Sequence, residues 1–597
     1  MTQAITIATP QMMTDPAMTP TSHARQRYCL SLAHINDTHS NFDPSRVQFS
    51  VELDAAQYEL HTHSGGYARI SYQVERKRAI AKRDGHTFLF LHGGDSFQGT
   101  LYFSQFKGVA NAHLLNLLKP DAMVLGNHEI DAGNAPVRAF LDRIEFPLLA
   151  GNMDLSQEVA GKKGELKGHR NLLDLDTEQQ IAKVLFKPMG DKTLAIVGIT
   201  LDQMKVIARP DPDTHFVDAI ATTQRTVDHL KAKGIDHIIV LSHLGLDQDR
   251  HLAEAVDGIS LIVGGHSHTL QGDFSHLGLS QLPYGEMRNG TPILHAGKYA
   301  ETLGLADIEF DAHGQVSALT GNNYFMLDSQ FVLQSSAQIC DATYQQIKQT
   351  LDEHPGILWD DEISTISDTI LRDYRPAIDA LEHQVLAFIP RNLVHTRLPS
   401  KALPHGSEIA PWVSRSMYQE AKALDTRVDF ALHNAGGVRQ SLPKGNLTLA
   451  EVVGRILPFE LPLVKYQIRG EYLYQALESA INAATNNSVI GTGAGSFPYT
   501  YGLRYFYDGR KPLGQRIIKL EIWQNDSWAL VSIEQEYVGV STAYTVAGKE
   551  GYHPLLQRNW QEPFDNLTLP QAFVQFVHKE SLQQELVPHV NYISHHA

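Results

Sequence analysis

The stretch Gly126-Asn127-His128-Glu129-Ile130-Asp131 follows a short apolar run at residues 122–125, which we interpret as a buried strand. Its polar side chains then stand in the loop after a strand, which is where α/β sheets place their sites. Asn127 offers an amide oxygen, His128 an imidazole and Asp131 a carboxylate. A single loop of this kind is usually ordinary turn chemistry, and His128 with Asp131 can also be a pair that caps a helix. The rest of the chain has to decide between these alternatives.

Four further apolar runs in the first half of the chain also end in loops that carry metal-ligand or acid–base side chains. They lie at residues 30–35, 87–91, 238–241 and 260–263, and they lead into Asn36-Asp37-Thr38-His39, Gly93-Gly94-Asp95-Ser96, Ser242-His243-Leu244-Gly245 and Gly264-Gly265-His266-Ser267-His268. Helical stretches alternate with the runs, which is the pattern of an α/β domain. We predict that the five loops converge, because such sheets form sites outside the carboxyl ends of their strands.

The side chains of these loops form a set of possible metal ligands without a thiolate. Asp37 and His39 are two residues apart, so on an extended segment they would point the same way. Asp95 supplies a carboxylate that can bridge two ions. The candidate ligands are Asp37, His39, Asp95, Asn127, His243, His266 and His268. Such nitrogen and oxygen donors suit two Zn²⁺, Mn²⁺ or Fe²⁺ ions rather than a structural cysteine site.

This ligand set indicates phosphoester chemistry. Two ions about 3.5–4 Å apart polarise a phosphoryl group and activate water for in-line attack. His128 directly follows the candidate ligand Asn127 and is best placed as a non-ligand that hydrogen-bonds the phosphoryl oxygens or the leaving group. Asp131, three residues further on, would orient its ring.

The composition limits the other possibilities. With 597 residues the chain is too long for one hydrophobic core, and its 43% hydrophobic and 19% charged residues are typical of globular proteins. No apolar run approaches the roughly 18 residues of a spanning helix, so we expect no membrane partner. The 50 Lys and Arg residues against 66 Asp and Glu give a formal charge of −16, which disfavours a nucleic-acid partner. Two cysteines exclude a disulfide scaffold.

We expect four segments along the chain. Residues 1–27 have no periodicity and are predicted to be a disordered tail without the basic and apolar regions of a signal peptide. Residues 28–335 form the first domain, residues 336–380 a helical connector or hinge, and residues 381–597 a second α/β domain. The expected location is the cytoplasm for the sequence as written, and a periplasmic or exported protein stays open if the true start differs.

The motifs of the first domain, in their order, resemble the calcineurin-like metallophosphoesterase signature. They are Asp37-x-His39, Gly94-Asp95, Gly126-Asn127-His128-Glu129, His243 and Gly265-His266-Ser267-His268, and they span about residues 30–270. The pattern Asn-His-Glu-x-Asp narrows the resemblance to the 5′-nucleotidase family. It implies a four-layer αββα metallophosphoesterase domain followed by a smaller α/β nucleotide-specificity domain.

The same resemblance assigns roles to the candidate residues. It implies that one metal takes Asp37, His39, Asp95 and His268 and that the other takes Asp95, Asn127, His243 and His266. It also implies that His128 and Asp131 are the catalytic dyad. The family often has Gln or Asn where this chain has His268.

The second domain contains segments that resemble the nucleotide site of the family. Asn434-Ala435-Gly436-Gly437-Val438-Arg439 resembles an Asn-x-Gly-Gly-Ile-Arg loop, which implies that Asn434 and Arg439 contact substrate. Phe459 and Tyr544 stand where the family carries two aromatic residues that stack on the base, although core packing is an alternative for each. Glu550 replaces an Asp expected on the ribose hydroxyls. The arginine expected before the first helix of this domain is missing from residues 403–412.

The sequence therefore predicts a phosphohydrolase with two divalent metal ions that converts nucleoside 5′-monophosphates to nucleoside and phosphate. Its partner is a small nucleotide. Three alternative substrates stay open at the same metal centre: 2′,3′-cyclic nucleotides, UDP-sugars and non-nucleotide phosphomonoesters. A protein that only binds nucleotide or metal is disfavoured, because all seven candidate ligands and the dyad are present.

Overall fold

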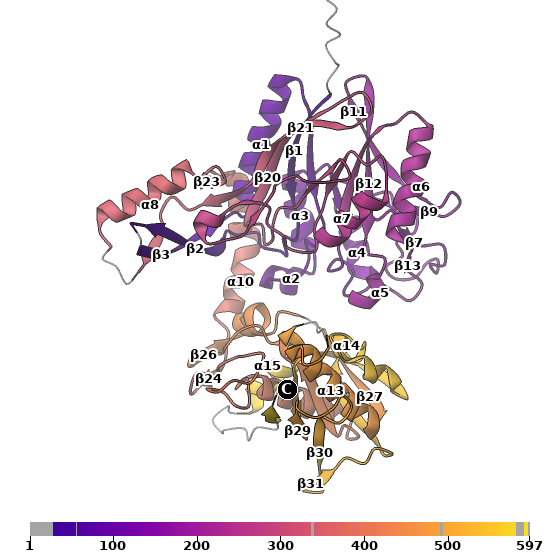
Figure 1. Ribbon diagram of the computed structural model, residues 1–597, viewed down its shortest axis with the longest axis vertical. Helices are drawn as coiled ribbons and strands as arrows, with labels where there is room; N and C mark the ends of the chain where they lie inside the picture. Colours follow the sequence, from indigo (N-terminus) through magenta and orange to yellow (C-terminus); the bar gives the residue numbers. More distant parts are fainter. Residues whose placement is uncertain are drawn as a thin grey trace, which may run out of the picture.

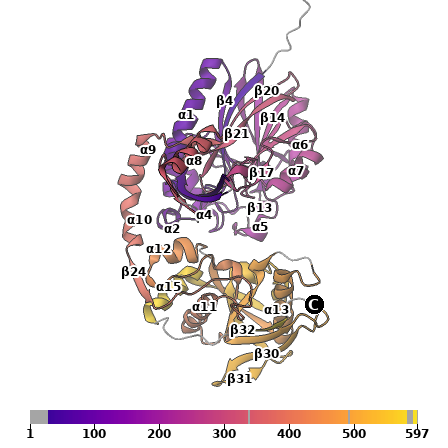
Figure 2. The same cartoon turned by 60° about the vertical axis from the view of Figure 1, so that its left-hand side comes forward.

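The computed structural model describes residues 28–594, apart from 55, 336–338, 460, 490–492 and 581–589. The tail predicted at residues 1–27 lies outside the described residues. Figure 1 shows an N-terminal domain in indigo to magenta above a C-terminal domain in orange to yellow, with helix α10 (Arg375–Glu382) between them. Figure 2 shows the same two domains after a turn about the vertical axis. Within the described residues, no helix combines the length and hydropathy that crossing a bilayer requires.

Two β-sheets form the middle of the N-terminal domain. The order of the first is β2 (Ser45–Leu53), β3 (Ala56–Ser64), β21 (Val316–Leu327), β20 (Thr302–Phe310), β1 (Tyr28–Ile35), β4 (Thr87–His92), β5 (Ala122–Val124), β6 (Leu148–Leu149) and β8 (Leu172–Leu173), with β22 (Val332–Gln334) beside β3 and β23 (Ile357–Trp359) beside β21. The order of the second is β11 (Val184–Met189), β12 (Lys192–Thr200), β14 (His237–His243), β15 (Leu261–Val263), β19 (Thr291–Leu294) and β18 (Glu286–Arg288). All five strands that the sequence predicts before the motif loops are present.

Strand β1 shows how the layers are built. Its apolar residues are buried on both faces, as expected of a central strand that pairs in parallel with β4. Leu30 and Leu32 join a buried cluster with β14 and β15 of the second sheet. Ala33 and Ile35 join another cluster with the helices on the outer face.

Helices cover the outer face of each sheet. On the first sheet they are α1 (Tyr67–Asp84), α3 (Val109–Leu118) and α4 (Asn134–Leu141), and on the second they are α6 (Ala219–Ala232) and α7 (Leu246–Ala255). Helix α1 begins after Gly65, where a Cβ atom would lie 1.8 Å from the Ala300 carbonyl oxygen, so this turn requires glycine. The predicted four-layer αββα fold is confirmed.

The segment predicted as a connector is mostly helical in its described part. It contains α8 (Asp341–Glu353), α9 (Ser364–Thr369), the π-helix η2 (Ile370–Tyr374) and α10, together with the strand β23, which the sequence analysis did not include. Ile347 and Leu351 of α8 pack in a cluster with strands β2 and β3. Ile370 and Ile378 are buried in the core of the N-terminal domain. Much of this segment therefore packs on the first domain.

The C-terminal domain is built on a mixed five-stranded sheet. Its order is β28 (Pro498–Tyr501), β25 (Phe430–Asn434), β32 (Glu536–Thr542), β27 (Pro462–Arg469) and β33 (Trp560–Thr568). A second sheet has the order β31 (Ser527–Leu530), β30 (Ile517–Gln524), β29 (Leu503–Asp508) and β34 (Val590–Ser594), and β24 (Val385–Ile389) pairs with β26 (Gly445–Thr448). Helices α11 (Ala410–Leu424), α13 (Gly470–Thr485) and α15 (Leu569–Lys579) contribute to its single large core. The expected α/β second domain is confirmed.

Candidate metal centre and adjoining pocket

The five motif loops meet at the carboxyl ends of strands from both sheets. Strands β1, β4 and β5 come from the first sheet, and β14 and β15 come from the second. Backbone hydrogen bonds tie the loops together: Asp37 N donates to Gly94 O at 2.9 Å, and His39 N donates to Asp95 O at 3.0 Å. The meeting point is therefore the common edge of two sheets rather than the edge of one.

The prediction that Asp37 and His39 lie on an extended segment is wrong. Both have left-handed backbone conformations, with φ of 50° and 47°. The hydrogen bonds to the loop after β4 impose this turn in place of an extended strand. The two side chains still approach each other, with His39 Nε2 4.0 Å from Asp37 Oδ1.

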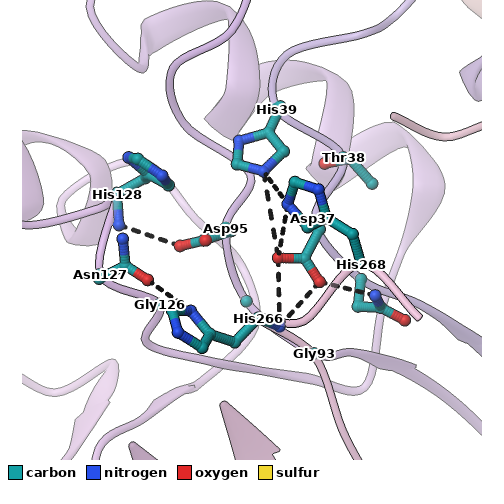
Figure 3. Close-up of polar contacts among 12 residues, drawn as sticks. Asp37, Thr38, His39, Gly93, Asp95, Gly126, Asn127, His128, His266 and His268 are labelled. Carbon is teal, nitrogen blue, oxygen red and sulfur yellow. Dashed lines mark hydrogen bonds and ion pairs between the residues drawn. The ribbon is translucent and has the colours of Figure 1, made fainter. Parts of the chain in front are cut away.

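One group of candidate ligands surrounds Asp37. One of its carboxyl oxygens and one ring nitrogen each of His39 and His268 lie within 4.8 Å of one another. His39 Nε2 is 3.0 Å from His268 Nε2, which in turn is 3.6 Å from Asp37 Oδ1. Figure 3 shows these three side chains pointing toward one another.

A second group surrounds His243. Its Nε2 atom is 3.2 Å from Asp95 Oδ2 and 3.3 Å from Asn127 Oδ1. Asn127 Oδ1 is also 2.9 Å from His266 Nδ1. Asp95 lies within 4.8 Å of ligand atoms of both His39 and the pair His243 and His266. It is thus placed between the two groups, and the structure brings all seven predicted ligands together.

Glycines allow this close packing. A Cβ atom at Gly126 would lie 2.1 Å from Asp95 Oδ1, and one at Gly94 would lie 2.6 Å from His243 Nδ1. Any larger residue at either position would displace a candidate ligand.

Hydrogen bonds fix the rings of two histidines. His243 Nδ1 is 2.7 Å from Gly93 O, and His39 Nδ1 is 3.1 Å from Phe97 O. Because a carbonyl oxygen only accepts, each Nδ1 carries a proton, and Nε2 is the ring nitrogen that faces the centre. This is the arrangement that metal-binding histidines need.

The ionisable groups of the centre are buried together. Asp37 and Asp95 are both buried, with 0% and 1% of their surface exposed. Burial raises the pKa of Asp37 to about 8, and the nearby charge of Asp95 adds to the rise while His243 opposes it. Burial lowers the pKa of His39 to about 3 and the pKa values of His266 and His268 to about 4, which keeps these rings neutral. Burial also opposes the charged form of His243, but Asp95 and Asp37 outweigh it and raise the pKa of His243 to about 9. Divalent metal ions that displace the protons of such buried carboxyl and imidazole groups fit this donor set.

The His128 side chain is held differently. Its Nδ1 atom is 2.5 Å from Asp131 Oδ2, and its backbone N donates to Asp95 Oδ1 at 2.9 Å. Burial opposes the charged form of the ring, but the carboxylates of Asp131 and Asp95 outweigh it and raise the pKa of His128 to about 10. The structure therefore places a protonated imidazole at the edge of the ligand cluster, with Nε2 as its second donor.

A pocket of about 610 Å³ connects this centre with the C-terminal domain. Its N-terminal wall includes Asn127, His128, Asp131 and His266, and its C-terminal wall includes all five predicted substrate residues, Asn434, Arg439, Phe459, Tyr544 and Glu550. Residues more than 300 positions apart in the chain thus face one cavity. Phe459 and Tyr544 line this cavity and are not packed into a core, which was the alternative for each of them.

The C-terminal wall is held by fewer contacts. Asn434 Nδ2 donates to Glu550 Oε2 at 3.2 Å, and Tyr544 is hydrogen-bonded to the same carboxyl group. The Arg439 guanidinium carbon lies 5.6 Å from the centre of the Phe459 ring. The positive charges of Arg397 and Arg439 both act on Glu550. Arg397 thus supplies a charge beside this wall, although no arginine stands in residues 403–412.

Known proteins resemble the chain over both domains. Residues 30–270 match the calcineurin-like phosphoesterase family, and residues 398–558 match the 5′-nucleotidase C-terminal domain. A probable 5′-nucleotidase of Treponema pallidum is 30% identical over 88% of this chain and 87% of its own length. The chain belongs to the 5′-nucleotidase family. The NAD 5′-nucleotidase of Haemophilus influenzae is 29% identical over 88% of the chain and 85% of its own length.

Solved structures of this family share the fold. The 5′-nucleotidase precursor of Thermus thermophilus matches 95% of this chain and 99% of its own, with a TM-score of 0.68 and 28% identity. The Haemophilus influenzae NAD nucleotidase matches 95% of the chain and 100% of its own, with a TM-score of 0.62 and 26% identity. As a calcineurin-like phosphoesterase, this 5′-nucleotidase family member uses divalent metal ions.

Two features of this 5′-nucleotidase site were missed by the sequence analysis. Glu129 was quoted without a role, yet its carboxylate accepts hydrogen bonds from the backbone N–H groups of Asp95, Ser96, Phe97 and Gly126, at 2.7–3.0 Å. Lys205 and Arg209 line the pocket from the loop after β12. That loop follows the buried strand β12, which is the same signal that identified the other five, but it carries no metal-ligand motif.

Proposed function

We propose that the protein hydrolyses nucleoside 5′-monophosphates to nucleoside and phosphate. The single observation that carries this proposal is the pocket that both walls share, because it puts the candidate metal centre, an arginine and two aromatic rings around one space. The names of the Treponema pallidum and Thermus thermophilus relatives support it.

Two divalent ions would be held by the seven candidate ligands. Asp37, His39, Asp95 and His268 would hold one, and Asp95, Asn127, His243 and His266 would hold the other. The donor set supports Zn²⁺, Mn²⁺ or Fe²⁺, since it consists of imidazoles, carboxylates and an amide without a thiolate. When bound, the ions polarise the phosphoryl group and lower the pKa of water.

The dyad stabilises the charge that develops during the reaction. Asp131 fixes the ring of His128 through Nδ1, so the Nε2–H group is free to donate to a phosphoryl oxygen or to the leaving oxygen. Because the ring is already protonated, its positive charge is in place before the phosphorus is attacked.

The C-terminal wall binds the nucleotide. Arg439 offers a planar fork of donors for the phosphoryl oxygens, and Asn434 lies beside it on the same loop. Phe459 and Tyr544 offer aromatic faces to the base. Glu550, hydrogen-bonded to Asn434 and Tyr544, is placed to accept hydrogen bonds from the ribose hydroxyls.

The cellular location of the protein is still open between two compartments. We keep the cytoplasm and export as two candidate locations, and the description of the Thermus thermophilus protein as a precursor supports export. Cell fractionation with an antibody against the native protein decides between them.

The test is phosphate release by chelator-stripped protein, with Mn²⁺, Zn²⁺ or Mg²⁺ added back. The substrates are AMP, UMP, UDP-glucose, 2′,3′-cyclic AMP and p-nitrophenyl phosphate. The proposal expects metal-dependent turnover that is highest on the nucleoside monophosphates. Metal-dependent activity on the other esters alone would contradict the roles of Phe459, Tyr544 and Arg439, and no activity with any metal would leave a binding protein.

A further inference from the structure

Arg209 brings a second arginine to the pocket, from the opposite wall to Arg439. It follows the short helix α5 (Met204–Ile207) and lines the pocket together with His128 and Asp131. Its Nη2 atom is buried, and no hydrogen-bond partner for it is found in the described part of the chain. A buried guanidinium donor without an acceptor is costly, so a ligand in the pocket that supplies one gains binding energy.

The loop that carries Arg209 is fixed to the start of α4. Asn134 N donates to Asp211 Oδ1 at 3.1 Å, and Asp211 N donates to Asn134 Oδ1 at 3.2 Å. Lys162 adds an ion pair with Asp211 at 2.9 Å. Because α4 begins at Asn134, three residues after Asp131, these bonds hold Arg209 in a constant position relative to the dyad.

The carboxylate of Asp131 acts electrostatically on Arg209, but Asp131 is already hydrogen-bonded to His128. Burial lowers the pKa of Arg209, and the charge of Asp131 opposes that change. Asp131 Oδ2 is bonded to His128 at 2.5 Å, and neither a hydrogen bond nor an ion pair joins Asp131 to Arg209, both of which the structure describes. The Nη2 donor of Arg209 therefore has no acceptor in the described part of the chain, and a ligand would have to reach it from the pocket that Arg209 lines.

A neighbouring lysine provides the contrast. Lys205 lines the same pocket, but its Nζ atom donates to Pro212 O at 3.0 Å and lies 3.0 Å from His215 Nδ1. Its ammonium group is thus hydrogen-bonded within the chain, whereas the Nη2 donor of Arg209 is not.

We propose that Arg209 is a specificity-determining residue that pairs with a second phosphoryl group of a nucleotide substrate. This inference rests on the proposed function. In a nucleoside 5′-monophosphate the only phosphoryl group goes to the metal centre and Arg439, so Arg209 gains no anionic partner. A further phosphoryl group on the leaving-group side supplies the acceptor pair that a guanidinium binds best. The reaction itself is unchanged: water adds to phosphorus, the bond to the leaving oxygen breaks, and that oxygen keeps the electron pair and takes a proton.

The test compares AMP with two substrates that differ in where the second phosphoryl group stands, ADP and adenosine 3′,5′-bisphosphate. In Arg209→Met we expect kcat/KM to fall about 10- to 100-fold on at least one of the two, because a hydrogen bond to a charged group is lost. On AMP we expect a change within about threefold, as for a substitution that removes no substrate contact. The substrate that loses more shows whether the second group is anhydride-linked or on the ribose.

Two further variants sharpen the result. Arg209→Lys keeps the charge without the fork, so it should recover part of the loss. Lys205→Met removes a pocket cation that is already partnered, so it should not reproduce the selective loss. Equal losses on all three substrates, or the same selective loss in Lys205→Met, would overturn the assignment.

A binding measurement separates this inference from the proposed function. The probes are an ADP analogue with a methylene bridge, which is not hydrolysed, and adenosine 3′,5′-bisphosphate with chelator-stripped protein, each titrated calorimetrically into wild-type protein and Arg209→Met. We expect Kd to rise about 10- to 100-fold in the variant for at least one probe, and an unchanged Kd for both would overturn the assignment. If wild-type protein fails to hydrolyse AMP with any metal, the proposed function fails, and this binding comparison still decides the role of Arg209.

Discussion

The two walls of the pocket are built in different ways. On the N-terminal side, seven candidate ligands stand on five loops that are tied to one another, and the carboxylates among them are buried. On the C-terminal side, the five candidate substrate residues are joined by a few contacts around Glu550 and Arg439. The first wall is a preorganised cluster of buried carboxyl and imidazole groups that suits divalent metal ions, whereas the second leaves aromatic and polar groups open to the cavity.

This difference separates two tasks. A cluster such as Asp37 and Asp95 cannot be rearranged without exposing or unpairing buried charge, so it suits chemistry that requires a constant geometry. Separate contacts such as those of Phe459 and Tyr544 can be changed one at a time, so they suit the choice of substrate. If the two walls are separable in this way, a substitution in one wall should leave the task of the other unchanged.

The largest effect is expected from Asp95→Asn. Asp95 lies between the two ligand groups, so this change removes a carboxylate from both. We expect kcat/KM on AMP to fall at least about 1,000-fold, since metal-ion stabilisation of several kcal/mol is lost. Metal content per chain, measured by inductively coupled plasma spectrometry, should fall below that of wild type. Asp247→Asn is the matched control, because that side chain is 90% exposed. A variant that keeps its metal and its turnover would refute the placement of Asp95 at the centre of the cluster.

His128→Gln should act on turnover without affecting metal content. The side chain is bonded to Asp131 and is not one of the predicted ligands. We expect kcat to fall about 100- to 10,000-fold, the range for losing a positioned acid or base. Loss of metal together with activity would instead make His128 a ligand.

The pH profile tests the other half of the dyad. Asp131 and Asp95 outweigh burial and raise the pKa of His128 to about 10, so the ring stays protonated below that pH. Asp131→Asn removes one of these charges and lowers the pKa of His128. If the protonated ring is the active form, the fall of kcat on the alkaline side should then begin at a lower pH than in wild type. An alkaline limb at the same pH in both proteins would show that another group controls it.

The residues of the N-terminal wall could be predicted from local sequence patterns, whereas those of the C-terminal wall could not. Each candidate ligand of the N-terminal wall stands within a few residues of the end of a buried strand. Local sequence pattern and strand topology were therefore enough to predict that these ligands lie together. What the sequence analysis missed there was the backbone: the left-handed turn at Asp37 and His39 comes from hydrogen bonds to a loop more than 50 residues away. The roles of Phe459 and Tyr544 came only from a family resemblance, because nothing in the local sequence distinguishes a ring that lines a cavity from one in a core.

Arg209 shows most clearly which site residues cannot be predicted from the sequence. Its loop follows a buried strand like the others, but a lone arginine before a proline has no recognisable pattern. Its significance depends on burial of one nitrogen atom and on the opposite wall of the pocket, which belongs to a different domain.

Phe459→Ala and Tyr544→Ala should have intermediate and selective effects. Loss of base stacking costs about 1–3 kcal/mol per ring, so kcat/KM on AMP should fall about 5- to 150-fold in each variant. Turnover of p-nitrophenyl phosphate, which has no nucleobase, and metal content should stay near wild type. Phe388→Ala is the control, because that ring is 60% exposed on β24 of the same domain. Equal losses on both substrates would mean that the aromatic rings stabilise the N-terminal wall, and the two walls would then not be separable.

The smallest effect is expected where the two walls are joined. Arg375 of α10 pairs with Asp43 of the first domain at 2.8 Å and with Asp379 at 3.0 Å, and Tyr102 donates to the same Asp43 oxygen at 2.7 Å. About a third of the Arg375 and Asp43 side chains is exposed, so solvent screens the pair. Arg375→Met should therefore lower the free energy of unfolding by less than about 1 kcal/mol.

Turnover is the more informative measurement for this variant. If the walls work as one rigid unit, kcat on AMP should stay within about twofold of wild type, because a screened ion pair contributes little. If substrate must be carried between the walls by movement of α10, a larger change in kcat should appear with metal content and the Kd for nucleotide unchanged. Arg372→Met controls for loss of a cation in the same helical segment, because Arg372 lies on the neighbouring turn and forms its ion pair with the adjacent Asp373. A change in kcat that is confined to Arg375→Met would show that the junction, rather than either wall, sets the rate.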